Sequence, residues 1–185
     1  MRETKPAATF ADLDQVPETM IGQIIDGALL VLPRPALPHA QTTSNAGADI
    51  NGRFGRARPP GGWWILDEPE LRLSADALVP DLAGWRRERL PALPSEPFLA
   101  LAADWVLEVL SPSTASIDRI AKARVYAREG VRWLWFIDPL ARTIEVNRLE
   151  AGGWLRVGAF HGGEPLRAEP FEAVEFDTAD WFATG

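Results

Sequence analysis

The stretch DWVLEVLSPSTASIDRIAKARVYAREGVRWLWFIDP, residues 104–139, organises the expected fold. Residues 105–110 form a short apolar run that predicts a buried strand. A helix is expected next, because Ser113 or Thr114 can cap it and Gly130 can end it. The stretch closes on a second, continuously apolar strand of the kind that is covered on both faces. Strand, helix and strand in this order favour an α/β domain.

The rest of the chain adds strands on both sides of this unit. Asp26-Gly27 lies between two apolar runs, which predicts an N-terminal β-hairpin with a two-residue turn. A second hairpin is expected across EAGG, residues 150–153. The other expected elements are a short helix at 10–15 capped by Thr9, a helix at 39–54, strands within 63–73 and 81–85, and a C-terminal helix capped by Asp177. We therefore predict one domain over residues 1–185, a central mixed β-sheet flanked by helices, with a loose tail at 1–8.

Composition narrows the classes of function. The 185 residues carry a net charge of −7, which is unusual for a protein that binds nucleic acid through a basic face. The chain has no cysteine, which excludes thiolate metal sites and cysteine nucleophiles. MRETKPAATFADLDQ lacks the apolar run of a signal peptide, and no stretch is apolar enough to span a membrane. We therefore expect a cytoplasmic protein with no membrane partner.

Glu108 is the residue that the predicted central strand does not explain. Alternate residues of a strand share a face, so Asp104, Val106, Glu108 and Leu110 should point one way. A carboxylate is costly to bury unless it is paired or bound to a metal ion. A partly exposed strand, a buried Glu–Arg pair or a metal site at the edge of the sheet would account for it.

Asp81 and Lys122 could meet Glu108 at one point. Asp81 begins another expected strand, and Lys122 lies on the helix directly after the Glu108 strand. Of 19 basic residues only Lys5 and Lys122 are lysines, which suggests that an ammonium is wanted inside the fold. Two carboxylates suit Mg²⁺ or Mn²⁺, and a nearby ammonium can stabilise developing negative charge.

Four further polar residues are candidates for a site. Asp118 precedes Lys122 by four positions, and Tyr126 follows it by four, so the three form a row that lines either a cleft or a solvated face. His39 begins the expected helix, and Gln23 sits among apolar residues of the first hairpin, where we expect its amide to be paired inside the sheet. The core side of the helix after residue 112 is expected to be an apolar stripe of Ile117, Ile120, Ala121 and Val125.

Other catalytic classes fit the sequence less well. SPST, residues 111–114, lacks the glycines of a serine nucleophile elbow. No glycine-rich phosphate loop precedes a helix. A glycosidase using Asp81 and Glu108 is conceivable, but no feature indicates a sugar cleft.

Several motifs together resemble one known family. IIDGALLVLPRPALPH, VPDLAGW, DWVLEVLSPST, DRIAKARVYAREGV and LWFIDP look like the Uma-two family of predicted endonucleases, a domain of unknown function. That family belongs to the PD-(D/E)xK nuclease superfamily, so the resemblance implies a restriction-endonuclease-like fold. It covers roughly residues 10–168, nearly the whole chain.

The resemblance also implies roles for particular residues. Asp81 would be the aspartate of the PD motif, and Glu108 the acidic residue of the second motif. The superfamily lysine normally stands two positions after that residue, where this chain has Leu110, and Lys122 on the following helix would replace it. The implied enzyme is a Mg²⁺- or Mn²⁺-dependent endonuclease in which Asp81, Glu108 and the Val109 carbonyl hold the metal ion.

The remaining alternatives concern the substrate and partner. The leading hypothesis is a metal-dependent nuclease acting on nucleic acid, with DNA favoured, in which His39, Gln23, Asp118 and Tyr126 support the site or contact substrate. A non-catalytic binding module, acting in a complex or as a homodimer, and a hydrolase of a small phosphorylated molecule are the other two. Arginines that could hold a phosphate backbone are Arg53, Arg56, Arg58, Arg86, Arg87 and Arg89.

Overall fold

The computed structural model describes residues 6–56 and 61–182, and these form two main sheets with two longer helical segments. The larger sheet has the strand order β11-β10-β9-β8-β6-β3, and the smaller has β2-β1-β5-β4-β7. β8 and β9 run parallel, while their outer neighbours pair antiparallel, so the larger sheet is mixed as predicted. The predicted tail at 1–8 lies mostly outside the described residues, and the amide of Ala8 donates to the Gly27 carbonyl at 2.8 Å.

The elements follow the chain in this order. The N-terminal part contains α1 (Phe10–Leu13), β1 (Met20–Ile25), β2 (Ala28–Pro33), α2 (Leu37–Phe54), β3 (Trp63–Asp67), β4 (Glu70–Leu73), β5 (Asp76–Leu78), β6 (Leu82–Arg86) and β7 (Phe98–Leu99). The C-terminal part contains β8 (Trp105–Val109), η1 (Ile117–Lys122), α3 (Ala123–Arg128), β9 (Trp133–Asp138), β10 (Thr143–Glu150), β11 (Gly153–His161), β12 (Pro165–Leu166), β13 (Phe176–Asp177) and η2 (Ala179–Phe182). None of the helices in the described part of the chain is long and apolar enough to cross a membrane.

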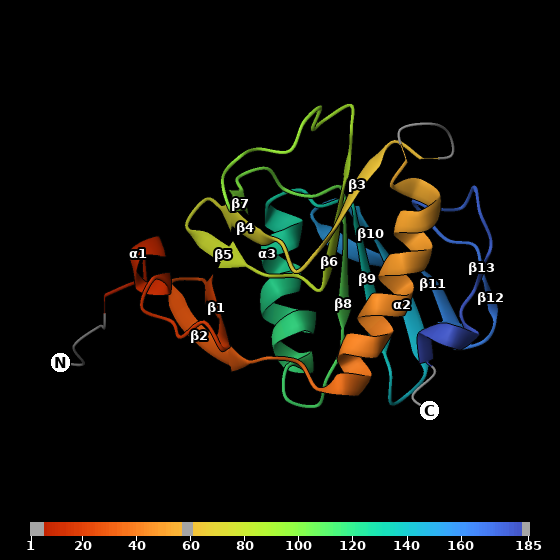
Figure 1. Cartoon of the computed structure of the whole chain (residues 1–185), viewed down its shortest axis with the longest axis horizontal. Helices are drawn as coiled ribbons and strands as arrows, with labels where there is room; N and C mark the ends of the chain where they lie inside the picture. The colour runs from red at the N-terminus through yellow and green to blue at the C-terminus, as the bar shows by residue number, and fades with distance from the viewer. Residues whose placement is uncertain (1–5, 57–60, 183–185) are drawn as a thin grey trace.

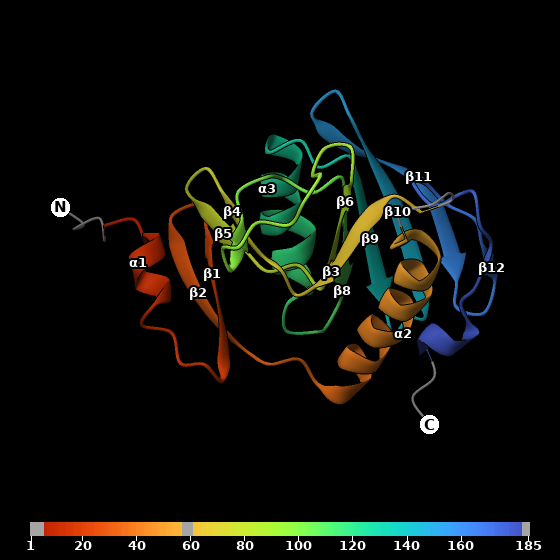
Figure 2. The same ribbon diagram turned by 45° about the horizontal axis from the view of Figure 1, so that its top comes forward.

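The larger sheet is covered on both faces, as the apolar strands predicted. One face packs against α2 and the C-terminal segment, and Trp105, Leu107 and Val109 of β8 contribute to that core. The other face carries Val106 and packs against α3. This helix lies between the larger and the smaller sheet (Figures 1 and 2). The alternation predicted for β8 is therefore confirmed, and Glu108 faces the α3 side.

Both predicted hairpins are present. β1 and β2 pair from Met20↔Pro33 to Ile25↔Ala28, and the turn residues Asp26 and Gly27 have φ of 50° and 77°. Positive φ at both positions is what a two-residue hairpin turn requires, and Asp-Gly adopts it readily. β10 and β11 form the second hairpin across Ala151 and Gly152.

The first hairpin is fastened to α3 by four charged residues, Asp26, Asp76, Arg124 and Arg128, which we call the hairpin latch. Buried Asp76 accepts a hydrogen bond from the Asp26 amide at 2.6 Å and pairs with Arg128. The Asp26 carboxylate pairs with Arg124 at 2.6 Å and with Arg128 at 3.4 Å. The latch fixes the hairpin beside the helix that carries Lys122.

Removing the Asp76 carboxylate should loosen the hairpin. Asp76→Ala leaves the Asp26 amide without its acceptor, so we expect a loss of about 2 kcal/mol of stability. For a chain of this length that loss lowers the melting temperature by about 4–8 °C, as measured by calorimetry. Asp76→Asn keeps an acceptor and should lose less, and exposed Glu88→Ala is the control. An Asp76→Ala variant that melts with the wild type would contradict this role.

Candidate active site

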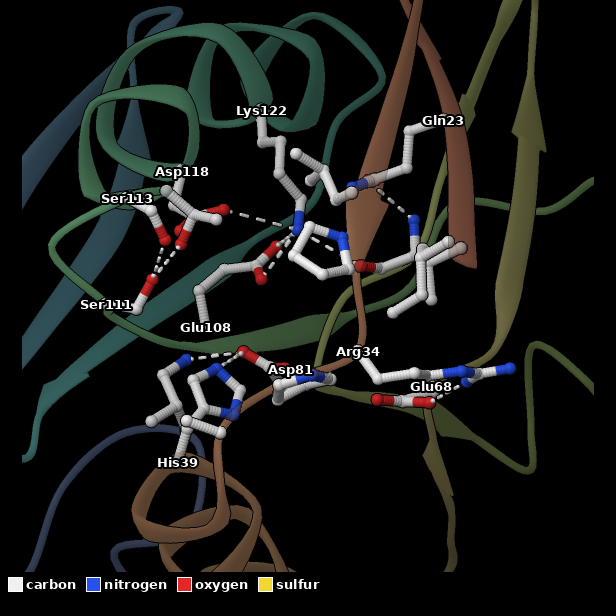
Figure 3. A pocket seen from close by; sticks show the side chains of 18 of the residues that line it. Gln23, Arg34, His39, Glu68, Asp81, Glu108, Ser111, Ser113, Asp118 and Lys122 are labelled. Atoms are coloured by element: carbon white, nitrogen blue, oxygen red, sulfur yellow. Dashed lines mark hydrogen bonds and ion pairs between the residues drawn. The ribbon is translucent and has the colours of Figure 1, made fainter. Parts of the chain in front are cut away.

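A pocket of about 370 Å³ lies where β8 ends and η1 begins. The first hairpin forms one wall and continues into residues 33–36, which we call the strap, and residues 111–114 form the opposite wall (Figure 3). Polar and charged residues that line it are Gln23, Arg34, His39, Glu68, Asp81, Glu108, Ser111, Ser113, Thr114, Asp118 and Lys122. All the predicted site side chains except Tyr126 therefore lie around one cavity. Val109, which was predicted to contribute its backbone carbonyl, lines the same cavity.

Glu108 is held by two donors from the following helix. The Lys122 ammonium contacts both carboxylate oxygens, at 2.6 Å and 2.7 Å, and the Tyr126 hydroxyl donates to Oε1 at 2.6 Å. Glu108 is 1% exposed, Lys122 is 3% exposed and Tyr126 is fully buried. The buried partner of Glu108 is thus a lysine, and the alternative of a Glu–Arg pair is wrong.

Asp118 and Lys122 lie in a π-helical turn, and Tyr126 follows in α3. η1 is a π-helix, and the Ala123 amide bonds the Asp118 carbonyl five residues back. Asp118 and Lys122 lie on one side of the helix, as the spacing of four residues predicted, and their charged groups approach to 3.5 Å. π-Turns are found frequently at functional sites.

The predicted apolar stripe is confirmed except at one residue. Val125 is buried, and Ile117 and Ala121 pack against the same core. Ile120, which was expected to face the core, is 65% exposed, so the prediction was wrong there. The helix start is close to the prediction, because Thr114 directly precedes the first helical residue and its carbonyl accepts from the amides of Ile117 and Asp118.

Burial and pairing act in opposite directions on the pKa values of the pair. Burial raises the pKa of the Glu108 carboxyl, and the Lys122 charge opposes this. Burial lowers the pKa of Lys122, but the charges of Glu108 and Asp118 outweigh it, so the Lys122 pKa is raised. Contact of one ammonium with both carboxylate oxygens is the geometry of an ion pair, and we describe it as one.

Asp81 occupies the other side of the end of β8 (Figure 3). Its Oδ2 accepts a hydrogen bond from the Val109 amide at 2.6 Å and lies 3.4 Å from Nε2 of His39. Burial lowers the pKa of His39, but the hydrogen bond and charge of Asp81 outweigh it and raise the pKa above its ordinary value. His39 lies in the first turn of α2, so the helix and the strand end together orient Asp81.

Gln23 connects the hairpin to the lysine through one peptide group. Its Oε1 accepts from the Val79 amide at 2.9 Å, and the Val79 carbonyl accepts from Lys122 at 3.1 Å. The prediction that Gln23 is paired inside the sheet is confirmed. The Gln23 side chain also orients the Val79 peptide group, whose carbonyl accepts the hydrogen bond from the Lys122 ammonium.

Several pocket residues were not singled out as site residues from the sequence. Arg34 on the strap is 57% exposed and pairs with Glu68 at 3.2 Å. On the opposite wall the Ser111 hydroxyl lies 3.0 Å from those of Ser113 and Thr114. An arginine after a proline and a turn rich in hydroxyls are common surface patterns, so only their placement around the pocket identifies them.

The predicted arginine cluster lies elsewhere. Arg86 is the last residue of β6, whereas Asp81 directly precedes that strand. Arg86 and the arginines that follow it therefore lie at the opposite end of the strand from the pocket. Arg87 donates to the carbonyls of Trp63 and Gly55 and stacks on Trp64 at 3.5 Å. Arg58 lies outside the described residues. The cations that line the pocket are therefore Arg34 and Lys122.

The carboxylate and carbonyl oxygens of the pocket are the type of ligand that a hard divalent cation such as Mg²⁺ prefers. Within residues 6–56 and 61–182, no three His, Asp or Glu side chains form a ready metal centre. Mg²⁺ needs only one or two carboxylates, because it keeps several waters. Both contacts of Asp81 use Oδ2, so Oδ1 is the oxygen that it would offer, while Glu108 would have to share its oxygens with Lys122.

Comparisons with known proteins agree with this fold. The model of the family described as "Uma2: Putative restriction endonuclease" matches residues 8–179. A crystal structure described as a "putative nuclease belonging to DUF820" from Anabaena variabilis ATCC 29413 superposes with a TM-score of 0.76 at 21% identity, covering 95% of this chain and 97% of the other. At that identity the likeness establishes a shared fold, the restriction-endonuclease-like fold that was predicted. No protein with a curated description matches.

Lys122 should be essential for stability because of its partner. Lys122→Met leaves the Glu108 carboxylate buried and without its cation, and we expect a loss of about 3–5 kcal/mol in urea denaturation. The double variant Glu108→Gln/Lys122→Met removes the charge as well, so it should recover at least half of that loss.

Arg119→Met provides the matched control, because Arg119 pairs with Glu145 at 2.7 Å on the surface. We expect it to cost no more than about 1 kcal/mol. A double variant that is no more stable than Lys122→Met alone would show that the pair does not account for the effect.

Proposed function

Since the chain belongs to the Uma2 family, described as "Putative restriction endonuclease", we propose that it hydrolyses phosphodiester bonds in nucleic acid with the help of Mg²⁺ or Mn²⁺. The observation that carries this proposal is the convergence of Asp81, Glu108 and Lys122 on one pocket. Two carboxylates and an ammonium are the groups that metal-assisted phosphoryl chemistry uses.

The charge of the pocket supports the need for a cation. Four carboxylates line it, from Glu68, Asp81, Glu108 and Asp118, against two fixed cations, Arg34 and Lys122. A phosphodiester would be repelled from a site with this balance. A divalent cation reverses the balance and makes the same residues attractive to phosphate.

Each type of donor in the pocket has a separate task in this proposal. Asp81 and Glu108, with the Val109 carbonyl, would hold the metal ion, which would supply a water of lowered pKa and neutralise charge on a phosphoryl oxygen. Lys122 keeps Glu108 ionised and in place through its two contacts. The positive charge of its ammonium would also stabilise the negative charge that develops on the attacked phosphate.

The remaining residues position these groups. Tyr126 holds Oε1 of Glu108, and His39 and the Val109 amide hold Oδ2 of Asp81. Gln23 and Asp118 fix Lys122, through the Val79 carbonyl and directly. Such supporting contacts set the orientation of carboxylate ligands, and their loss typically costs about 10- to 100-fold in metal affinity or activity.

One observation favours a second candidate, a binding module that does not cut. Both oxygens of Glu108 already accept short hydrogen bonds, from Lys122 and Tyr126. These three contacts use most of the acceptor sites of the carboxylate and leave one on Oε2, which disfavours metal binding by Glu108. Metal binding therefore separates the two candidates independently of cleavage.

Loss of the pocket groups should abolish cleavage. With Mg²⁺ or Mn²⁺ and labelled DNA and RNA, we expect Lys122→Gln to reduce the rate by at least about 100-fold. Asp81→Asn should weaken Mn²⁺ binding by at least about tenfold, measured by calorimetry without substrate. Circular dichroism of each variant checks that it is folded.

Glu150→Gln, an exposed carboxylate on β10, is the control and should leave both properties unchanged. Cleavage that survives in Lys122→Gln and Asp81→Asn alike would refute the assigned site. Wild-type protein that neither binds Mn²⁺ nor cuts would support the binding module.

A further inference from the structure

The hairpin wall of the pocket is a fixed part of the fold. β1 pairs with β2 along six residues and also with β5 through Ile24↔Ala77. The hairpin latch ties its turn to α3, and Gln23 bonds the Val79 amide. A strand held on both edges and at its turn cannot swing aside as a flap without breaking these contacts.

The strap continues that wall to the start of α2. Pro33, Pro35 and the next helix restrict its conformations, because each proline fixes one φ angle. The strap carries Arg34, whose guanidinium bonds Glu68 and the Glu18 carbonyl. The opposite wall is the turn at 111–114, so the cavity of about 370 Å³ lies between two ordered segments. Such a volume is at the small end of about 300–1,000 Å³ for ligand pockets.

The groups assigned to the chemistry lie deep in this cavity. Glu108 and Lys122 are almost fully buried, and Asp118 beside them is buried as well. A phosphate can reach them only if the backbone that carries it enters between the strap and the turn. A single strand can do so one nucleotide at a time, whereas a duplex brings its second strand and a groove about 6 Å or 12 Å wide with it.

The polar groups at the entrance suit a short single-stranded segment. Arg34 on one wall can pair with a phosphate, and the hydroxyls of Ser111, Ser113 and Thr114 on the other can donate to phosphate or sugar oxygens (Figure 3). The net charge of −7 is a poor match for the long row of phosphates on a duplex surface.

We propose that this pocket takes a single-stranded segment of nucleic acid, threaded between Arg34 and the 111–114 turn, and excludes the intact duplex. The inference rests on the proposed function for the identity of the site. It deepens that function by naming the class of substrate. Unpaired ends, gaps and loops in DNA or RNA would all present such a segment.

Binding can test the inference without relying on cleavage. Wild-type protein with Ca²⁺ in place of Mg²⁺ would be titrated into labelled single-stranded 12-mers of DNA and RNA, the blunt duplex, and a duplex with a central unpaired gap, with anisotropy as the readout. We expect the single strand and the gapped duplex to bind at least tenfold more tightly than the blunt duplex. Equal affinity for the blunt duplex, a mononucleotide that binds as tightly as the 12-mer, or no binding at all would overturn the inference.

Arg34→Ala should weaken single-strand binding by about tenfold, through the lost charged hydrogen bond. Arg167→Ala is a matched control, because Arg167 is 56% exposed and likewise contacts a carboxylate, that of Glu175, and a backbone carbonyl, that of Glu172, yet does not line the pocket. If both variants lose affinity equally, or neither does, Arg34 does not guide the strand.

Arg128→Ala tests the rigid wall, because it removes two contacts of the hairpin latch. We expect the preference for single strands to narrow in this variant, and an unchanged preference would contradict exclusion by the hairpin. Gel assays with Mg²⁺ then separate the two proposals. Selective binding of single strands without any cutting would refute the nuclease but not the single-strand pocket. Cutting of the blunt duplex at the same rate as the single strand would refute the single-strand pocket but not the nuclease.

Discussion

The carboxylate of Glu108 is buried in the middle of a strand, and the arrangement around the pocket depends on neutralising it. One ammonium reaches both of its oxygens, and one phenol hydroxyl reaches Oε1. An unpaired carboxylate at that depth would cost several kcal/mol, so the helix after β8 must present Lys122 and Tyr126 inward. Lys122 ends the π-helical turn and Tyr126 lies four residues later in α3, so both side chains are on the buried side of the helix.

The ammonium in turn links the two sheets. Lys122 donates to the Val79 carbonyl, and the Val79 amide donates to the side-chain oxygen of Gln23 in the first hairpin. The hairpin is therefore connected to the centre of the site by a short chain of hydrogen bonds, in addition to the hairpin latch at its turn. Cooperative networks of this kind hold charged groups in one orientation, which is the condition for electrostatic catalysis.

The acidic balance of the protein is consistent with a site that works on few phosphates at a time. Long-range attraction cannot gather a duplex onto a surface of net negative charge. Inside a small pocket, Lys122 and Arg34 offset part of the negative charge, and the proposed metal ion would offset more of it. At the other end of β6, Arg87 donates to the carbonyls of Trp63 and Gly55 and stacks on Trp64. This arginine therefore serves packing there.

The sequence by itself determined the α/β class, the two hairpins, the faces of β8, and the candidates Asp81, Glu108 and Lys122. These features follow from local patterns. The periodicity of apolar residues, the residues of a turn and the spacing of a motif can each be recognised within a few positions of the chain. Only the tertiary contacts reveal that Lys122 neutralises Glu108, that Gln23 bonds the Val79 amide, and that Arg34 and the 111–114 turn line the same pocket. These contacts join different elements of the chain. Their geometry is set by the packing of sheets and helices, which no local pattern encodes.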